Sequence, residues 1–166
     1  MGHLQRALSP VSDKPGVTPV SIPLLRQCAL AVIFVMLAVG LHRIFITNIN
    51  WDEFYFLSLV HLNQNGALTS PLQTLHVHLF GWLPLISENT LQQIYAARIF
   101  IWILGVGTCW LIYDIAGKFC SRDAALFPVL FYLGFSYVME HGLSFRTDPL
   151  CAFLFLSSLH LLLGEN

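Results

Sequence analysis

Residues 28–41 read CALAVIFVMLAVGL, an apolar run that contains no charged side chain. Continued to residue 46, the run has 19 residues, close to the ~20 with which an α-helix crosses a bilayer. Arg43 lies near its end, from where a long side chain can reach the membrane surface. The small residues at 38–40 also suit a signal-peptide cleavage site. Because more apolar runs follow, we expect a retained membrane helix.

Three further apolar runs lie at residues 95–115, 124–139 and 149–163. The run at 124–139 carries no charge, and the run at 149–163 is short for a crossing. We therefore predict an all-α, polytopic membrane protein with about four transmembrane helices. Together with the first run, near 28–46, these segments form one transmembrane region over residues 28–163.

The composition agrees with a membrane protein. Only 10% of the 166 residues are charged and the mean hydropathy is +0.69, whereas a soluble domain is about 25% charged. A disordered chain, a nucleic-acid binder with a basic face and an ordinary secreted globule are excluded. The four cysteines show no CxxC and no zinc spacing, and we expect small buried hydrophobic residues.

Two segments differ from the apolar runs. Residues 1–27 are polar and interrupted by prolines, which predicts a flexible tail. Residues 47–93 form a long loop in which polar and aromatic residues alternate, and its amphipathic stretches predict helices lying on the membrane surface. The helically spaced side chains are Phe54, Leu57, Val60 and His61 in one stretch, and Leu68, Leu72, Leu75 and Leu79 in the next.

The distribution of Lys and Arg sets the expected orientation. Five lie on the side of the tail, against three on the other side: Arg6, Lys14, Arg26, Lys118 and Arg122, against Arg43, Arg98 and Arg146. The tail is therefore predicted to be cytoplasmic. The loop at 47–93 would then face the periplasm across an inner (plasma) membrane, or the lumen of the endoplasmic reticulum.

This orientation gathers ionisable residues on the external side. Five of the nine acids and five of the seven histidines fall there: Asp52, Glu53, Glu88, Glu140 and Asp148, with His42, His61, His76, His78 and His141. A passive anchor has no need of them, whereas an external active site would.

Asp52 and Glu53 lie between aromatic residues just after the first run. Neighbouring side chains on a helix diverge by about 100°, so one acid can touch a substrate while the other holds structure or a cation. Aromatic surroundings would raise a carboxyl pKa towards the range of a general base. The alternative is that Asp52 is the N-cap of the following helix.

Arg146, Asp148 and Pro149 precede the last run. Proline suits the first turn of a helix and the preceding aspartate suits its N-cap. Arg146 is a planar donor fork that matches phosphate, and with a helix start it would form an anion site. The alternative is a capped helix with an arginine that anchors it at the interface.

His76 and His78 can act as metal ligands or substrate donors. On a helix the two side chains would not share a face, whereas on an extended strand they would. The pair is weak support for a metal site, and histidines at the membrane interface are the alternative.

In combination these features resemble the start of the GT-C membrane glycosyltransferases. The order is one N-terminal span, an external Asp52-Glu53, a surface-helical loop, and Arg146-Thr147-Asp148 before a later span. The chain looks like the family 39 group, which includes protein O-mannosyltransferases and the lipid A aminoarabinose transferase. Residues 71–84 resemble the His-Pro-rich segment of that family's first loop, with Val77 and His78 where a proline pair is more usual. The likeness covers roughly residues 24–163.

The resemblance implies transfer of a sugar from a polyprenyl-phosphate donor. Asp52 would be the base or acceptor contact, and Glu53 would support it. His76 and Asp148 would contact substrate, and Arg146 would meet the donor phosphate. A divalent cation is used by some members, with Glu53 and His78 as candidate ligands here.

Members of this family have about a dozen spans, so the chain corresponds to an N-terminal part and is expected to be inactive alone. Two functions of other classes remain as alternatives. One is a non-catalytic four-helix subunit or assembly factor, in which the acids cap helices and the arginines anchor them. The other is a transporter, which the first three runs disfavour because they carry no ionisable residue at mid-span.

Overall fold

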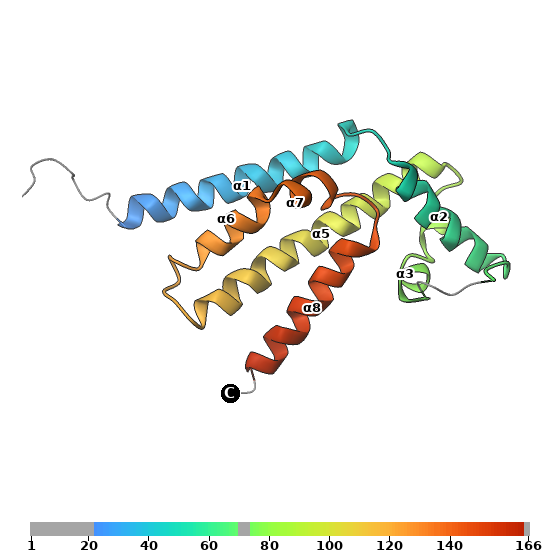
Figure 1. The fold of residues 1–166 in the computed structure, drawn as a ribbon. Coiled ribbons are helices and arrows are strands. Elements are labelled where there is room, and N and C mark those ends of the chain that lie inside the picture. The colour runs from blue at the N-terminus through green and yellow to red at the C-terminus, as the bar shows by residue number, and fades with distance from the viewer. Residues whose placement is uncertain (1–21, 70–73, 165–166) are drawn as a thin grey trace, which may run out of the picture.

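The computed structural model describes residues 22–69 and 74–164, and within them every regular element is a helix. Figure 1 shows long helices side by side, with short helices gathered beyond one end of them. The elements in chain order are α1 Ile22–Ile46, α2 Trp51–Gln64, α3 Thr74–Leu79, α4 Leu83–Ile86, α5 Thr90–Gly117, α6 Leu126–Gly134, α7 Ser136–His141 and α8 Thr147–Gly164.

Three helices of the described chain are long and apolar enough to cross a membrane: α1, α5 and α8. Large apolar side chains such as Phe34 and Phe155 are exposed on them, as expected where lipid and not water is the neighbour. The predicted all-α membrane protein is confirmed. α1 begins at Ile22, so the last residues of the predicted tail 1–27 are helical, and residues 1–21 lie outside the described residues.

The run at 124–139 is not one continuous helix, and that prediction is wrong. α6 ends at Gly134, Phe135 is extended with ψ 125°, and α7 then begins at Ser136. Glycine weakens a helix interior, which allows the chain to break there. α6 and α7 together still run alongside α1, because Arg26 lies 3.6 Å from Asp123 at one end and Arg43 donates to the Met139 carbonyl at the other. The bundle therefore has four segments, one of them broken.

The loop after α1 folds into a small head built from α2, α3 and α4 against the start of α5 (Figure 1). α2 buries Leu57 and Val60, two of the positions that the helical spacing indicated. In the second predicted stretch only Leu75 and Leu79 are helical; Leu68 lies outside a helix and Leu72 outside the described residues. The core of the head consists of Phe56, Leu57, Val60, Val77, Phe80, Leu83, Ile94, Ala97, Ile101 and Phe145.

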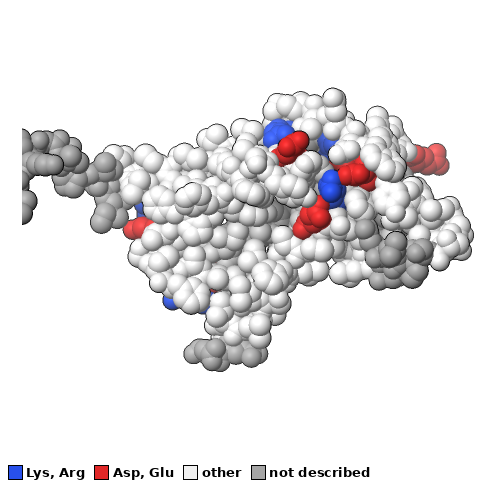
Figure 2. Space-filling model, viewed as in Figure 1, with Lys and Arg blue, Asp and Glu red and all other residues white. Residues whose placement is uncertain are grey.

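Charged side chains mark the two ends of the bundle. Figure 2 shows them gathered near the head and again near the opposite end, with a broad uncharged band between. At the end away from the head, Asp114 of α5 pairs with Arg122 at 3.0 Å and accepts from His160 of α8 at 3.0 Å. A band of this kind is what the hydrocarbon core of a bilayer requires.

Candidate functional site

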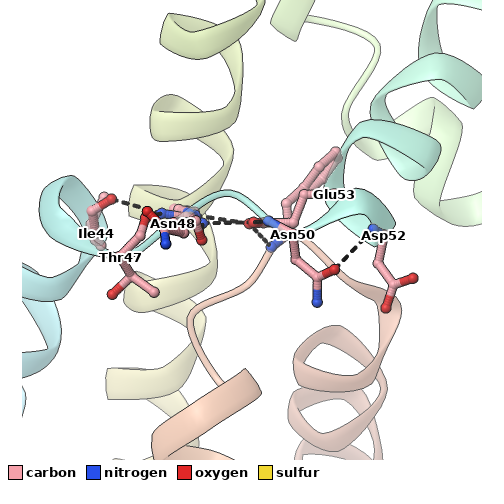
Figure 3. Close-up of polar contacts among 8 residues, drawn as sticks. Ile44, Thr47, Asn48, Asn50, Asp52 and Glu53 are labelled. Carbon is pink, nitrogen blue, oxygen red and sulfur yellow. Dashed lines mark hydrogen bonds and ion pairs between the residues drawn. The ribbon is translucent and has the colours of Figure 1, made fainter.

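The start of α2 is fixed by a capping box around Asn50 (Figure 3). The Asn50 side chain accepts from the backbone N–H of Asp52 at 3.4 Å, and Glu53 accepts from the Asn50 backbone N–H at 3.0 Å. Asn50 and not Asp52 is thus the N-cap, so the alternative role considered for Asp52 is wrong. Because Asn50 and Glu53 satisfy the helix start, the carboxylate of Asp52 is not needed there.

Glu53 lies in a fully buried ion pair with Arg98 of α5. Arg98 donates through Nε to Oε1 at 2.8 Å and through Nη2 to Oε2 at 2.6 Å, a bidentate arrangement. Oε1 also accepts from the backbone N–H of Phe145 at 2.8 Å. The other donors of Arg98 reach the carbonyls of Ile44, Thr47 and Asn48. This network ties the end of α1, the start of α2, α5 and the segment before α8 together.

The surroundings of Glu53 keep it ionised. Burial alone would raise its pKa, but the hydrogen bonds from Arg98, Phe145 and Asn50 and the charge of Arg98 outweigh burial and leave the pKa below its ordinary value. Both carboxylate oxygens are occupied by protein donors, so in this conformation Glu53 offers no free lone pair towards a cation. Its contacts with Asn50, Arg98 and Phe145 are those of a residue that holds the head on the bundle.

Arg146 brings two acids together on the same side of the protein. Its Nη1 lies 2.5 Å from Oδ2 of Asp52, 94 residues away, and its Nε lies 3.0 Å from Oδ2 of Asp148. Tyr137 of α7 donates its hydroxyl to the same Asp148 oxygen at 3.0 Å. The side chains of Asp52 and Arg146 are 32% and 24% exposed, so this group, unlike Glu53, remains open to a ligand. We call Asp52, Tyr137, Arg146 and Asp148 the external cluster.

The external cluster keeps unused hydrogen-bonding capacity. Among the described residues, Nη2 of Arg146 and Oδ1 of Asp52 have no protein partner. α8 begins at Thr147, so Asp148 lies in its first turn, and its predicted role as the N-cap is wrong. Asp148 instead fixes the guanidinium of Arg146. The arrangement therefore offers the N–H groups of Nη2 as donors and carboxylate oxygens of Asp52 and Asp148 as acceptors to a molecule that approaches the head.

His76 is buried in the head and does not belong to the external cluster. Its ring lies among Phe56, Phe80 and Phe145 with centroid distances of 5.3, 4.7 and 4.8 Å. Neither ring nitrogen has a hydrogen-bond partner in the described structure, and burial lowers the pKa of His76 to about 4. In this conformation it has no open face towards a substrate, and its packing supports a structural role.

His78 lies on the opposite side of α3 and is exposed. The expectation that the two histidines would not share a face of a helix is met. Within residues 22–69 and 74–164 there is no group of three acids, histidines or cysteines arranged to hold a metal ion. The candidate ligands Glu53 and His78 are accordingly not part of such a group, and all four cysteines are free.

Because His76 is buried and neutral, we expect the free energy of unfolding to depend on pH. Between the ordinary pKa of 6.5 and the folded value of about 4, only the unfolded chain binds the proton, so stability falls as the pH falls through this window. From pH 7.5 to 5 the wild type should lose about 2 kcal/mol more than His76→Phe. Unfolding followed by tryptophan fluorescence in detergent measures this difference.

The control is His78→Phe, the same substitution at an exposed position of the same helix. It should keep the wild-type dependence on pH. Parallel curves for the wild type and His76→Phe would contradict the buried, neutral histidine.

Arg98 and Tyr137 were not singled out by the sequence as site residues. Arg98 stands at the start of an apolar run, where an arginine is usually an interface anchor, and Tyr137 lies inside an apolar run. The comparisons of this chain with protein-family models, with curated proteins and with solved structures found no match.

Proposed function

We propose that the external cluster is part of the site of a membrane glycosyltransferase that uses a sugar linked to polyprenyl phosphate. The observation that carries the proposal is the contact between Asp52 and Arg146, which are 94 residues apart in the sequence and both partly exposed. A carboxylate can accept the proton of an acceptor hydroxyl, and a planar guanidinium beside it can bind a phosphate-linked donor. The resemblance of the sequence to GT-C enzymes supports the same reading.

Each residue then has a distinct task. Arg146 binds the donor phosphate through its unused Nη2, and Asp148 and Tyr137 hold the guanidinium in place. Asp52 accepts the proton of the acceptor or binds it. The buried pair of Glu53 and Arg98 fixes the start of α2 and thereby the position of the Asp52 backbone. A completed lipid groove would come from further spans of such an enzyme.

A non-catalytic membrane subunit is the second candidate, and one observation favours it. Arg146 is already paired with two carboxylates, so the external cluster can serve to hold α2, α7 and α8 together. In that case the exact shape of the cation matters little. The two functions therefore differ in what they expect of a lysine at position 146.

The guanidinium fork is the feature to test. Arg146→Lys keeps the charge, but an ammonium group cannot reproduce the planar arrangement in which Nη1 and Nε hold Asp52 and Asp148 while Nη2 stays available to a phosphate. In the protein expressed from its complete reading frame and placed in nanodiscs, this variant should bind a polyprenyl-phosphate analogue about tenfold more weakly. Arg146→Ala should weaken binding further. Arg122→Lys, at the opposite end of the bundle, serves as the control and should bind as the wild type does. Equal affinities for the wild type, Arg146→Lys and Arg146→Ala would leave only the structural role.

We also propose that the N-terminus is cytoplasmic and that the head faces the periplasm or the lumen of the endoplasmic reticulum. The excess of Lys and Arg near the start of α1 and in the link after α5 supports this orientation. In a background without the native cysteines, a cysteine at the exposed position Asn65 should react with an impermeant maleimide added to intact cells or from the luminal side. A cysteine at Ser121, in the opposite link, should be protected.

The reverse labelling pattern would overturn the orientation. Reaction at Asn65 only after the cytoplasmic side is opened is the decisive form of that result.

A further inference from the structure

An apolar groove of about 240 Å³ lies between α1, α5 and the broken segment of α6 and α7. Along α1 it extends from Val35 to Arg43, and Trp102 of α5 and Tyr132 of α6 line its other walls. Except for Arg43 at one end, no charged residue lines it. The groove therefore lies within the membrane-crossing part of the protein and ends at a single cation near the head.

The groove is open because the sequence places small residues around it. Gly40, Gly105 and Gly142 all line it. A Cβ on Gly105 would meet nothing within 4 Å, and a Cβ on Gly40 would lie 3.6 Å from the side chains of Leu143 and Trp102, which also line the groove.

Arg43 at the mouth of the groove retains free donors. Its Nη1 donates to the Met139 carbonyl, and no carboxylate of the described residues lies within ion-pair distance of it. Glu140 lines the small polar cavity beside Arg43 but does not pair with it. An unpaired guanidinium at the membrane surface attracts an anion, and it matches the geometry of phosphate.

We propose that this groove holds one acyl chain of a membrane glycerophospholipid whose phosphate lies on Arg43. A cation at the surface above an apolar channel matches such a lipid, in which the phosphate lies above its chains. From Arg43 to Val35 the channel descends ~12 Å along the helix. Its volume is below the ~300 Å³ of pockets that enclose drug-sized ligands, which suits one chain and excludes a helix or a bulky headgroup. The proposal does not depend on Arg146 or on the proposed transfer.

The experiment uses the wild-type protein in phosphatidylglycerol nanodiscs that contain a trace of the same lipid with a diazirine in one acyl chain. After illumination, the label should be found on the peptides that contain Trp102 and Tyr132. Gly105→Leu fills the open space at Gly105 and should reduce this label at least about fivefold. Gly164→Leu is the matched control, because a Cβ on Gly164 would meet only Lys118 Nζ at 4.0 Å and Gly164 does not line the groove, and it should label as the wild type does.

Two further experiments identify the lipid that occupies the groove. Arg43→Gln should reduce the labelling by the phospholipid but not by a diazirine diacylglycerol, which has no phosphate. Labelling that Gly105→Leu leaves unchanged would overturn the proposal, and so would equal loss of both probes in Arg43→Gln. Displacement of the label by an equimolar amount of polyprenyl phosphate would also overturn it, since the groove would then belong to the isoprenoid lipid.

Discussion

Arg98→Met should destabilise the protein by about 3–5 kcal/mol, the usual cost of leaving one partner of a buried ion pair uncompensated. Glu53 is 0% and Arg98 3% exposed, so water cannot replace the lost partner. The substitution also releases the carbonyls of Ile44, Thr47 and Asn48. Unfolding of the purified protein in detergent, followed by tryptophan fluorescence, measures the loss.

Two variants distinguish the effect of breaking the buried ion pair from the effect of removing any arginine. Arg122→Met removes an arginine whose side chain is 61% exposed, and it should change stability little. The double variant Arg98→Met with Glu53→Leu removes both charges and should recover a large part of the loss, because no buried charge is left unpaired. A change in Arg98→Met as small as in Arg122→Met would contradict the role of the buried pair.

Asp52→Asn should reduce sugar transfer by about 10²–10⁴-fold, the usual contribution of a general base. The amide keeps the size of the side chain and can still accept a hydrogen bond from Arg146, but it cannot take up a proton. Stability should hardly change, because Asn50 and not Asp52 caps α2. The assay is transfer from a polyprenyl-phosphate sugar by the protein expressed from its complete reading frame.

The matched control is Asp123→Asn, which removes an exposed acid at the opposite end of the bundle. It should transfer at the wild-type rate. Wild-type transfer by Asp52→Asn, with normal expression and membrane insertion, would remove Asp52 from the chemistry and leave it only its contact with Arg146.

The sequence predicts the large features of this fold because they depend on local pattern. Length and hydropathy alone indicate α1, α5 and α8, and helical spacing indicates α2. The break after Gly134 was not predicted, since the run 124–139 carries no charge and has no proline next to the break, and a single Ser136 is common inside apolar helices. An apolar run shows that a segment enters the membrane but not that it is one straight helix.

The candidate site was predictable only in part, and for a related reason. Asp52, Arg146 and Asp148 carry charge at the ends of apolar runs, where it is conspicuous. That Glu53 is buried depends on Arg98, which lies 45 residues further along the chain, and no local pattern contains this contact. The alternative role of Asp52 as a cap is wrong because Asn50, two residues before it, is an equally good cap and occupies that position. The predicted substrate contact of His76, and the alternative of an interfacial histidine, both missed its burial, because α3 is too short for a sequence pattern to show which side is buried.

The proposed function depends on a contact between Arg146 and the phosphate of an isoprenoid lipid. The most direct measurement compares the affinity of the protein in nanodiscs for a polyprenyl phosphate and for the polyprenol of the same chain length. A hydrogen bond to a charged group predicts that the wild type binds the phosphate at least about tenfold more tightly. This preference should disappear in Arg146→Ala. Equal affinity of the wild type for the two lipids, or a preference that survives in Arg146→Ala, would contradict the account.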